Sequence, residues 1–516
     1  MTTSAAPDSR MQESVFAFLT DPAMHPLVQR IDTHAASVFL EGERALKIKR
    51  AVRFPFLDYS TLEKRKAACD EEIKINRPFA PQIYRRVVPI TQSNDGSLDI
   101  DGDGTPVEYA IEMARFDEHQ TIDHLAEAGE PDSDLVNAIA EVIAASHAVA
   151  PRAAAAPWID SIPAFIEGNA TAFRTAACFP AKAIDDLSAA SQSAFLRIRG
   201  LLRQRGREGY VRRCHGDLHL ANIVLIERKP VLFDAIEFDP TMASVDVLYD
   251  LAFPIMDFIR YDRHAAANAL LNRYLAITPV ENLDALAALP LFMSLRAAIR
   301  ANVLLARLAR AGDDKADVMQ SARAYFELAR LTIRPPAPKL VAVGGLSGTG
   351  KSVLARALAP GVTPPPGAVV LRTDVLRKQR FQVTETDKLS ESAYQPEITA
   401  QIYGVLMRRA ARILVQGHSV VVDAVFALET ERAAICDAAR KLNIRFVGLF
   451  LVTDLAIRMS RVSHRERDAS DATPEIAEIQ EKYDIGEVDW AVIDASGTPE
   501  QTLKQCQTRI APCDPA

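Results

Sequence analysis

Cysteine is scarce in this chain, with six residues among 516, and no two of them form a C-x-x-C pair. Scattered cysteines of this kind are typical of reduced thiols in a cytosol, where they act as packing residues. The sequence also lacks any run of about 18 apolar residues, and its N-terminus has no basic start followed by an apolar stretch. These absences predict a soluble cytoplasmic protein that does not insert into a membrane.

Blocks of like charge are absent as well. The formal net charge is −7, and no cluster of Lys/Arg or of Asp/Glu stands out. Binding of nucleic acid requires a basic footprint, so no nucleic-acid partner is expected, whereas a cationic substrate is compatible with this balance. These features leave the oligomeric state open.

The length predicts more than one domain, because single hydrophobic cores stop growing near about 250–300 residues. The clearest boundary is the segment RPPAP at 334–338, which follows a stretch with helical periodicity over 283–333. Prolines end a helix and stiffen a spacer. We therefore expect a first domain over 1–333, a linker over 334–338 and a second domain over 339–516.

A phosphate-binding signature of the form G-x-x-x-x-G-K-S lies between the apolar run 340–343 and a helix-like stretch. A strand, a glycine loop and a helix in this order let backbone N–H groups and the helix N-terminus hold phosphate oxygens. The lysine reaches the β- and γ-phosphates, and the serine hydroxyl is placed to bind Mg²⁺. The alternative is a glycine-rich turn without a ligand. The expected nucleotide-binding residues are Gly345, Ser347, Gly348, Thr349, Gly350, Lys351 and Ser352.

The first domain begins with short strand-like runs at 37–40, 45–49, 85–90 and 107–113, and helical patterns follow them. A small sheet-rich lobe followed by a larger helical lobe is the layout of kinase-like folds. The expected fold class of the first domain is therefore α+β, with two lobes.

A second phosphate-handling signature, HGDLHLAN, occupies residues 215–222. It has the aspartate-to-asparagine spacing of kinase catalytic loops, in which the aspartate accepts the proton of the substrate hydroxyl and the asparagine binds Mg²⁺. These residues are Asp217 and Asn222. The apolar run 230–233 then leads to Asp234, where kinases place the metal-binding aspartate of the D-F-G motif. The alternative is a loop whose side chains only cap turns.

Lys47 and Lys49 lie on one face of an expected strand because side chains alternate with period two. Either lysine could neutralise the α- and β-phosphates, and we prefer Lys47 from its Ala-Leu-Lys context. Glu71 or Glu72, on the helix-like stretch that follows, is the expected partner of that lysine, and we favour Glu72.

Residues 30–330 resemble the aminoglycoside phosphotransferase and choline kinase superfamily. The resemblance is carried by HGDLHLAN, by the stretch FDAIEF at 233–238 and by DVLYDLA at 246–252. The resemblance implies that Asp217 is the catalytic base and that Asn222 and Asp234 bind Mg²⁺. It also implies that the backbone around Glu112 and Met113 contacts the adenine of ATP.

Other features of this domain refine the resemblance. His215 and His219 are expected to order the loop rather than transfer protons, and Asp246 and Asp250 to support the loop and a helix. No G-x-G-x-x-G loop covers the phosphates and no A-P-E segment is present. Phosphorylation of protein substrates is therefore not expected.

The second domain alternates strands, expected at 340–343, 368–371, 419–422, 445–451 and 490–493, with helices. This order predicts an α/β fold with a mainly parallel, doubly wound sheet. Asp374 and Asp423 follow two of the strands, at the sheet edge where such folds bind ligands. Asp374 could accept a proton from a substrate hydroxyl, and Asp423 could hold Mg²⁺. The alternative is that each aspartate caps a following turn or helix.

Arginines are concentrated in the segment 458–472, just after a strand. A planar guanidinium suits the oxygens of a transferring phosphate, and Arg461 and Arg465 are the candidates. This segment resembles the lid of small P-loop kinases of the gluconate kinase, zeta-toxin and polynucleotide kinase group, and the Arg-Thr-Asp sequence ending at Asp374 resembles their acceptor-side motif. The likeness covers 339–510. The alternative is a solvated basic helix face.

The two signatures together predict a bifunctional phosphotransferase that uses ATP or GTP with Mg²⁺ on small hydroxylated substrates. One alternative is that a single domain transfers phosphate and the other binds or hydrolyses nucleotide as a regulator. A second alternative is a sensor or scaffold that binds nucleotide without turnover. Neither acceptor is identified by the sequence, because substrate pockets vary freely within one fold.

Overall fold

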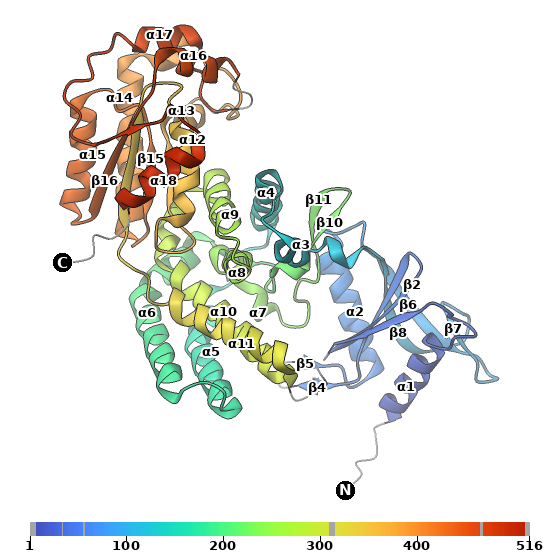
Figure 1. Ribbon diagram of the computed structural model, residues 1–516. Coiled ribbons are helices and arrows are strands. Elements are labelled where there is room, and N and C mark those ends of the chain that lie inside the picture. Colours follow the sequence, from blue (N-terminus) through green and yellow to red (C-terminus); the bar gives the residue numbers. More distant parts are fainter. Residues whose placement is uncertain (1–6, 34, 55–56, 309–314, 465–467, 511–516) are drawn as a thin grey trace. The chain divides into compact units, whose positions relative to one another are not determined.

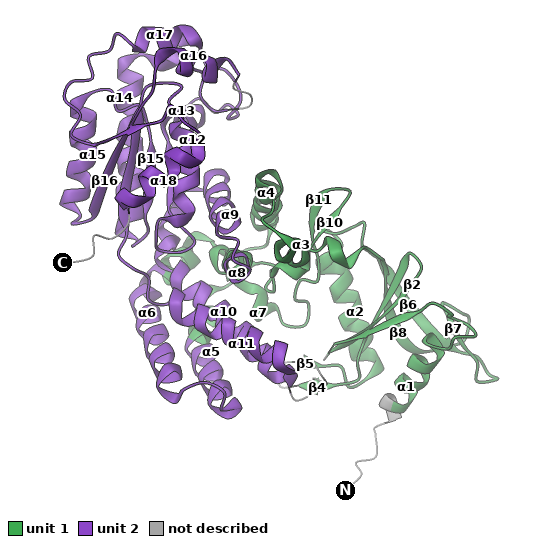
Figure 2. Ribbon diagram, in the orientation of Figure 1, with its two compact units in different colours: residues 1–162, 202–257 green, residues 163–201, 258–516 purple. Residues whose placement is uncertain are grey.

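The structure is a computed structural model, and it describes residues 7–33, 35–54, 57–308, 315–464 and 468–510. The chain forms two compact units, shown in Figure 2. Unit 1 contains residues 1–162 and 202–257, and unit 2 contains residues 163–201 and 258–516.

Unit 1 begins with a six-stranded antiparallel sheet of order β1-β2-β3-β8-β6-β7 (Figure 1). Four of the strands correspond to the four runs expected from the sequence, namely β2, β3, β6 and β8. The strands are β1 (Gln29–Asp32), β2 (Ala36–Glu41), β3 (Arg44–Lys49), β6 (Tyr84–Gln92), β7 (Leu98–Ile100) and β8 (Thr105–Ala114).

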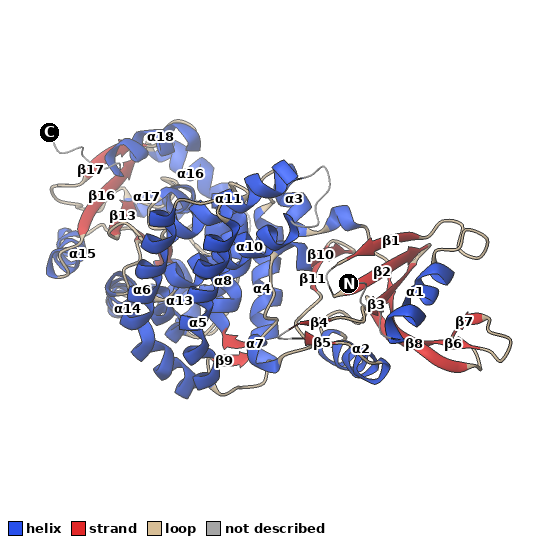
Figure 3. Ribbon diagram, turned by 90° about the horizontal axis from the view of Figure 1, so that it is seen from below, coloured by secondary structure: helices blue, strands red, loops and turns tan. Residues whose placement is uncertain are grey.

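Two helices, α1 (Pro7–Leu19) and α2 (Leu62–Asn76), cover different faces of this sheet (Figure 3). Phe16 of α1 belongs to the same buried cluster as Ile48 of β3, whereas Cys69 of α2 is clustered with Ile111 of β8. Because successive side chains of a strand point to opposite faces, Lys47 lies on the side opposite to Ile48, facing α2. The strand thus delivers a lysine to the site and an isoleucine to the core.

The rest of unit 1 is mainly helical, with three short two-stranded pairings. Its helices are η1 (Glu118–Gln120), α3 (Ile122–Ala128), α4 (Ser133–Val149), the first part of α5 (Ala155–Ala176), the last part of α6 (Ala181–Glu208), η2 (Leu220–Asn222), α7 (Pro240–Ala243) and the first part of α8 (Val247–Arg260). The pairings are β4 (Arg53–Phe54) with β5 (Leu57–Asp58), β9 (Val211–Arg213) with β12 (Ser244–Asp246), and β10 (Ile223–Ile226) with β11 (Lys229–Leu232). The β10–β11 hairpin frames the loop that carries HGDLHLAN.

Unit 2 contains a group of helices that pack on one another. They include most of α5 (Ala155–Ala176) and of α6 (Ala181–Glu208), followed by α9 (His264–Ile277), η3 (Val280–Ala287), α10 (Leu289–Leu308) and α11 (Lys315–Thr332). Ser294 of α10 donates a hydrogen bond to the carbonyl of Ala329 on α11 over 2.8 Å. Among the described residues, α10 is the one helix long and apolar enough to cross a membrane, and more than half of it is buried within the protein.

The remainder of unit 2 is a five-stranded parallel sheet of order β14-β15-β13-β16-β17 with helices along it. The expected α/β class is therefore confirmed. The strands are β13 (Lys339–Gly345), β14 (Val369–Arg372), β15 (Val420–Asp423), β16 (Arg445–Val452) and β17 (Ala491–Asp494). The helices are α12 (Lys351–Leu358), η4 (Ala359–Gly361), α13 (Thr373–Arg380), η5 (Glu391–Tyr394), α14 (Pro396–Val415), α15 (Glu429–Lys441), α16 (Leu455–Ser463), α17 (Pro474–Gln480) and α18 (Pro499–Ile510).

Helix α9 binds the edge of this sheet through two asparagine side chains. Asn272 accepts a hydrogen bond from the backbone N–H of Val370 on β14 (2.7 Å), and its amide donates to the carbonyl of Ala368 (3.1 Å). Asn268 donates to the same carbonyl over 3.0 Å. Helix α9, which precedes the proline-rich segment 334–338, therefore forms hydrogen bonds with backbone groups at the outer edge of β14 and directly before it. The role of that segment as the domain boundary remains a prediction.

His418, between α14 and β15, makes the folding of the sheet sensitive to pH. Burial lowers its pKa from the ordinary 6.5 to about 4, and its Nε2 lies 2.8 Å from the carbonyl of Gly367. Between these two pH values the unfolded histidine is protonated while the folded one is neutral, so stability falls as pH drops through this window. The full loss is about 3 kcal/mol, since one pKa unit corresponds to about 1.4 kcal/mol.

We predict that the free energy of opening of β14 and β15, measured by amide hydrogen exchange and corrected for intrinsic rates, decreases from pH 7 to pH 4 by about this amount. His418→Gln retains a donor for Gly367 and does not titrate, so this variant is expected to show a smaller decrease. An equal pH dependence in the two proteins would contradict the assignment.

Candidate active sites

The backbone of the loop that carries Asp217 is held in place by hydrogen bonds from two side chains. Asp250 of α8 accepts hydrogen bonds from the backbone N–H groups of His215 (3.2 Å) and Gly216 (2.9 Å). The side-chain amide of Asn222 donates to the backbone carbonyl of Asp217 over 2.9 Å. The carboxylate of Asp217 is 44% exposed, so it is open to an incoming hydroxyl while its backbone is held.

The two histidines of the motif lie in supporting positions. His215 is buried, which lowers its pKa, and its Nε2 donates to the carbonyl of Phe233 over 2.8 Å. His219 has its Nε2 3.5 Å from a carboxylate oxygen of Asp217. Asp246, which was expected to be a support, forms a buried bidentate ion pair with Arg205 (2.7 and 2.9 Å). These contacts order the loop and its surroundings.

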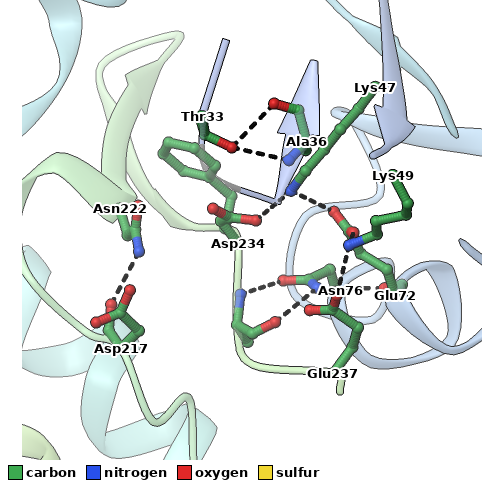
Figure 4. A network of polar contacts seen from close by, with 12 residues as sticks. Thr33, Ala36, Lys47, Lys49, Glu72, Asn76, Asp217, Asn222, Asp234 and Glu237 are labelled. Carbon is green, nitrogen blue, oxygen red and sulfur yellow. Dashed lines mark hydrogen bonds and ion pairs between the residues drawn. The ribbon is translucent and has the colours of Figure 1, made fainter. Parts of the chain in front are cut away.

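Lys47 joins the sheet, helix α2 and Asp234 at one point (Figure 4). Its Nζ lies 2.8 Å from Oε1 of Glu72 and 2.5 Å from Oδ1 of Asp234. Burial disfavours the charged lysine, but the carboxylates of Asp234 and Glu72 outweigh it and raise the pKa of Lys47 well above its ordinary value. Burial likewise opposes ionisation of Asp234, yet Lys47 keeps the pKa of that carboxyl below its usual range. Both groups therefore stay charged.

Lys49, the alternative to Lys47, lies deeper in the same network (Figure 4). It forms ion pairs with Glu72 and Glu237 and is 4% exposed, whereas Lys47 is 13% exposed. Tyr59 donates its hydroxyl to Glu237 over 2.8 Å. The more open Lys47, which also reaches Asp234, is therefore the better candidate for contact with phosphate.

The network also decides between the two neighbouring glutamates of α2. Glu72 is fully buried and meets both lysines, while Glu71 is partly exposed and pairs with Lys74 of the next turn over 2.9 Å. Glu237 and Tyr59 were not predicted from the sequence. Glu237 lies within the quoted stretch FDAIEF, but no local pattern indicates that it meets a lysine 188 residues away.

Asn222 and Asp234 flank the open end of the β10–β11 hairpin. The backbone N–H of Phe233 donates to the carbonyl of Asn222 over 3.1 Å. Asn222 directly precedes β10 and Asp234 comes shortly after β11, and these two strands are paired. A carboxylate and an amide oxygen are hard ligands of the kind that Mg²⁺ prefers. The residues present here therefore fit a magnesium ion.

Glu112 and Met113, predicted to contact the adenine, lie near the end of the central strand β8. They are paired with Leu46 and Ala45 of β3, and Glu112 also forms an ion pair with Arg86 over 3.0 Å. Their backbone is thus part of the sheet, and contact with a base remains a prediction.

The glycine loop of the second site connects β13 to α12. Gly345 has φ +133°, and a Cβ there would lie 2.5 Å from the carbonyl oxygen of Leu451; Gly348 has φ +87° and would place a Cβ 2.6 Å from that of Arg458. No larger side chain fits either position, because the loop passes directly against other backbone. Lys351 donates to the carbonyl of Leu346 over 3.1 Å.

Two other loop residues complete this segment. Gly350, at φ +94°, is the N-cap of α12, and Thr349 donates its hydroxyl to the carbonyl of Leu346 over 2.8 Å. The loop therefore leads from a buried strand into a helix N-terminus, the arrangement that holds phosphate.

Arg372 is the centre of the polar cluster at the ends of β14 and β15. Ser352 donates its hydroxyl to Asp423 over 2.6 Å, and the Arg372 guanidinium contacts Asp423 (3.1 Å), Ser352 (3.0 Å) and Asp468 (2.9 Å). Burial disfavours a charged arginine, but Asp423 and Asp468 raise its pKa. The oxygens of Ser352 and Asp423 thus contact the same cationic group, the Arg372 guanidinium. Two oxygens that share a cation in this way fit the predicted role of these residues as Mg²⁺ ligands.

Asp374 lies in the first turn of α13, directly after β14, and is half-buried. Burial and the neighbouring charge of Asp423 raise the pKa of its carboxyl, against the opposing effect of Arg372 and Lys351. A carboxylate with a raised pKa is a stronger base than an ordinary aspartate.

One of the two predicted lid arginines lies within the described residues. Arg461, at the end of α16, donates to the carbonyl of Gly497 over 3.0 Å. Arg465 lies outside the described residues. Asp468 and Gln480 have no role predicted from the sequence, yet they contact Arg372 and Ser347 of the second site. Their positions follow from loop geometry that no motif encodes.

Comparisons with known proteins support two kinase-like domains. Residues 36–289 match the model of the phosphotransferase enzyme family, and residues 340–483 match that of an AAA domain. An uncharacterized protein of Mycobacterium tuberculosis is 27% identical over 500 residues, which cover 93% of this chain and 95% of that protein.

Two solved structures are also similar. A choline/ethanolamine kinase family protein from Mesorhizobium loti is 15% identical, with 63% of this chain and 99% of that chain covered and a TM-score of 0.35. A gluconokinase from Sinorhizobium meliloti 1021 is 19% identical, with 34% of this chain and 91% of that chain covered and a TM-score of 0.25. The resemblance inferred from the sequence, of an aminoglycoside phosphotransferase/choline kinase-like part followed by a P-loop kinase-like part, is confirmed by the family models.

We predict that Glu72→Gln lowers turnover at the first site by about 10- to 100-fold, because Lys47 and Lys49 lose the carboxylate that positions them. The measurement is nucleotide turnover in a Lys351→Ala background, which removes the contribution of the second site. Glu71→Gln is the matched control, since its ion pair is with Lys74 at the surface. Equal turnover in the two variants would show that Glu72 does not position the lysines.

Proposed function

We propose that this chain of two kinase-like domains is a bifunctional phosphotransferase, which transfers the γ-phosphoryl group of ATP or GTP to hydroxyl groups of small molecules. The observation that carries the proposal is the position of Lys47 between Glu72 and Asp234. A charged lysine beside a metal-type aspartate, in the same unit as the Asp217 loop, supplies the groups that phosphoryl transfer requires.

In the first site, Lys47 holds the α- and β-phosphates, and Glu72 fixes the lysine. Asp217 accepts the proton of the acceptor hydroxyl as that oxygen attacks the γ-phosphorus. The bond from the γ-phosphorus to the oxygen shared with the β-phosphate breaks, and ADP or GDP leaves. Asn222 and Asp234 hold Mg²⁺, which when bound neutralises charge on the phosphates.

In the second site, the backbone N–H groups of the glycine loop and Lys351 hold the phosphates. Asp374 accepts the proton of the second acceptor, and its raised pKa suits this role. Ser352 and Asp423 hold Mg²⁺. Arg461 and Arg465 neutralise the transferring phosphoryl group, as the resemblance to small P-loop kinases implies.

The alternatives are a kinase with one regulatory nucleotide domain and a sensor without turnover. The second is disfavoured because nucleotide binding alone does not require Asp217 on a fastened loop or Asp374 with a raised pKa. We further propose that the protein acts in the cytoplasm on small-molecule acceptors and without a membrane or nucleic-acid partner.

The decisive experiment uses the full-length chain and three variants: Asp217→Asn, Lys351→Ala and the combination of both. Each protein is challenged with ATP or GTP, Mg²⁺ and a panel of sugars, aminoglycosides, nucleosides and small alcohols. Activity with one acceptor that is lost only in Asp217→Asn, and activity with another that is lost only in Lys351→Ala, would support two transferase sites. If every acceptor-dependent activity depends on one site, the other domain is regulatory.

We predict that Asp217→Asn lowers transfer at the first site by about 10²- to 10⁴-fold, the range expected when a general base is removed. Nucleotide binding at that site should persist, because Lys47 and Asp234 are unchanged. Calorimetric titration with a non-hydrolysable ATP analogue, together with turnover, checks both parts. A variant with undiminished transfer would remove Asp217 from the mechanism.

A further inference from the structure

We propose that two residues of this chain block the second site. Gln480 occupies a backbone donor of the glycine loop, and Arg372 occupies the predicted metal ligands. A nucleotide with Mg²⁺ therefore has to displace both residues before it binds. This inference rests on the proposed binding of nucleotide at Lys351. It assigns a function to residues 468–480, of which only 468–472 fall within the segment that resembles the lid of small P-loop kinases.

Gln480, the last residue of α17, places its side-chain oxygen against the glycine loop. Its Oε1 accepts a hydrogen bond from the backbone N–H of Ser347 over 2.7 Å, and the residue is only 8% exposed. In a P-loop, backbone N–H groups such as that of Ser347 point inward to phosphate oxygens. One N–H makes one good hydrogen bond, so a phosphate oxygen and the Gln480 oxygen compete for this donor.

Arg372 engages the predicted metal ligands in the same way. Its guanidinium lies 3.0 Å from the hydroxyl oxygen of Ser352 and 3.1 Å from a carboxylate oxygen of Asp423. A bound Mg²⁺ needs these oxygens at about 2.1 Å with near-octahedral geometry, which leaves no room for a guanidinium between them. The arginine and the metal therefore exclude each other.

One segment ties these two contacts together. Asp468 forms an ion pair with Arg372 over 2.9 Å, and Asp471 binds Lys378 over 2.6 Å and accepts from the hydroxyl of Tyr394 over 2.5 Å. Thr473 then caps α17, which ends at Gln480. When a magnesium ion displaces Arg372, the ion pair between Arg372 and Asp468 weakens. When a phosphate oxygen displaces Gln480, the other end of the segment is released from the glycine loop.

The acceptor side is linked to the same segment. Lys378 and Tyr394, the partners of Asp471, belong to α13 and η5, and Asp374 is on α13 as well. Occupation of the glycine loop by a magnesium nucleotide thus loosens residues that border the predicted base. A site that must first open binds its ligand more weakly, by the fraction of molecules that are open.

The test is the affinity of the full-length protein for a non-hydrolysable ATP analogue with Mg²⁺, measured by calorimetry. Binding that disappears on Lys351→Ala is assigned to the second site. Gln480→Ala is expected to tighten this binding by about three- to tenfold, the usual effect of one hydrogen bond. Glu478→Ala, an exposed change on the same helix, is expected to leave the affinity unchanged and is the matched control.

A second measurement does not depend on a substitution. Amide hydrogen exchange of residues 468–480 in the unchanged protein should become at least threefold faster on addition of the magnesium analogue. Unchanged or weaker binding by Gln480→Ala, or exchange that stays constant or slows, overturns the proposal. If Lys351→Ala removes no binding at all, the proposed function of the second site fails instead, so the two failures are distinct.

Discussion

The first site depends on two lysines that are surrounded by carboxylates in the interior of unit 1. Lys47 and Lys49 come from one strand, Glu72 from a helix, and Asp234 and Glu237 from a loop far along the sequence. A buried charge without its partner is strongly destabilising, so each element is held where its charge is neutralised. The network therefore fixes the predicted phosphate-binding lysine and the predicted metal ligand relative to each other before any ligand arrives.

Much of this arrangement could be predicted from the sequence, because local patterns carry it. Alternating apolar residues indicated β2, β3, β6 and β8, and buried apolar runs indicated the five strands of the parallel sheet. Asp217, Asn222 and Lys351 belong to motifs whose spacing reflects the geometry of one loop. The preference for Glu72 over Glu71 had no such local pattern behind it, since one residue along a helix changes the direction of a side chain by about 100° and only the position of the helix decides which glutamate faces the lysines.

The remaining site residues could not be predicted, since they meet partners distant in sequence. Gln480 is 133 residues from Ser347, and Arg372 is 96 residues from Asp468. Arg372 was noticed only as part of an acceptor-side motif, and its position on Ser352 and Asp423 depends on the parallel pairing of β14 with β15. The contacts of Arg372 with Ser352 and Asp423 follow from the order of strands in the sheet, and those of Gln480 and Asp468 follow from loop geometry. A single sequence leaves both undetermined.

The asparagines of α9 have a consequence for the behaviour of the protein in solution. An unpaired outer strand is a template onto which another polypeptide can add in β-conformation, the first step of many aggregation processes. Asn272 forms hydrogen bonds with the N–H of Val370 and the carbonyl of Ala368, and Asn268 forms a second one with that carbonyl. These backbone groups lie at the outer edge of β14 and directly before it. A fragment that begins after the proline-rich segment would expose this edge, and self-association through β14 would then compete with its folding.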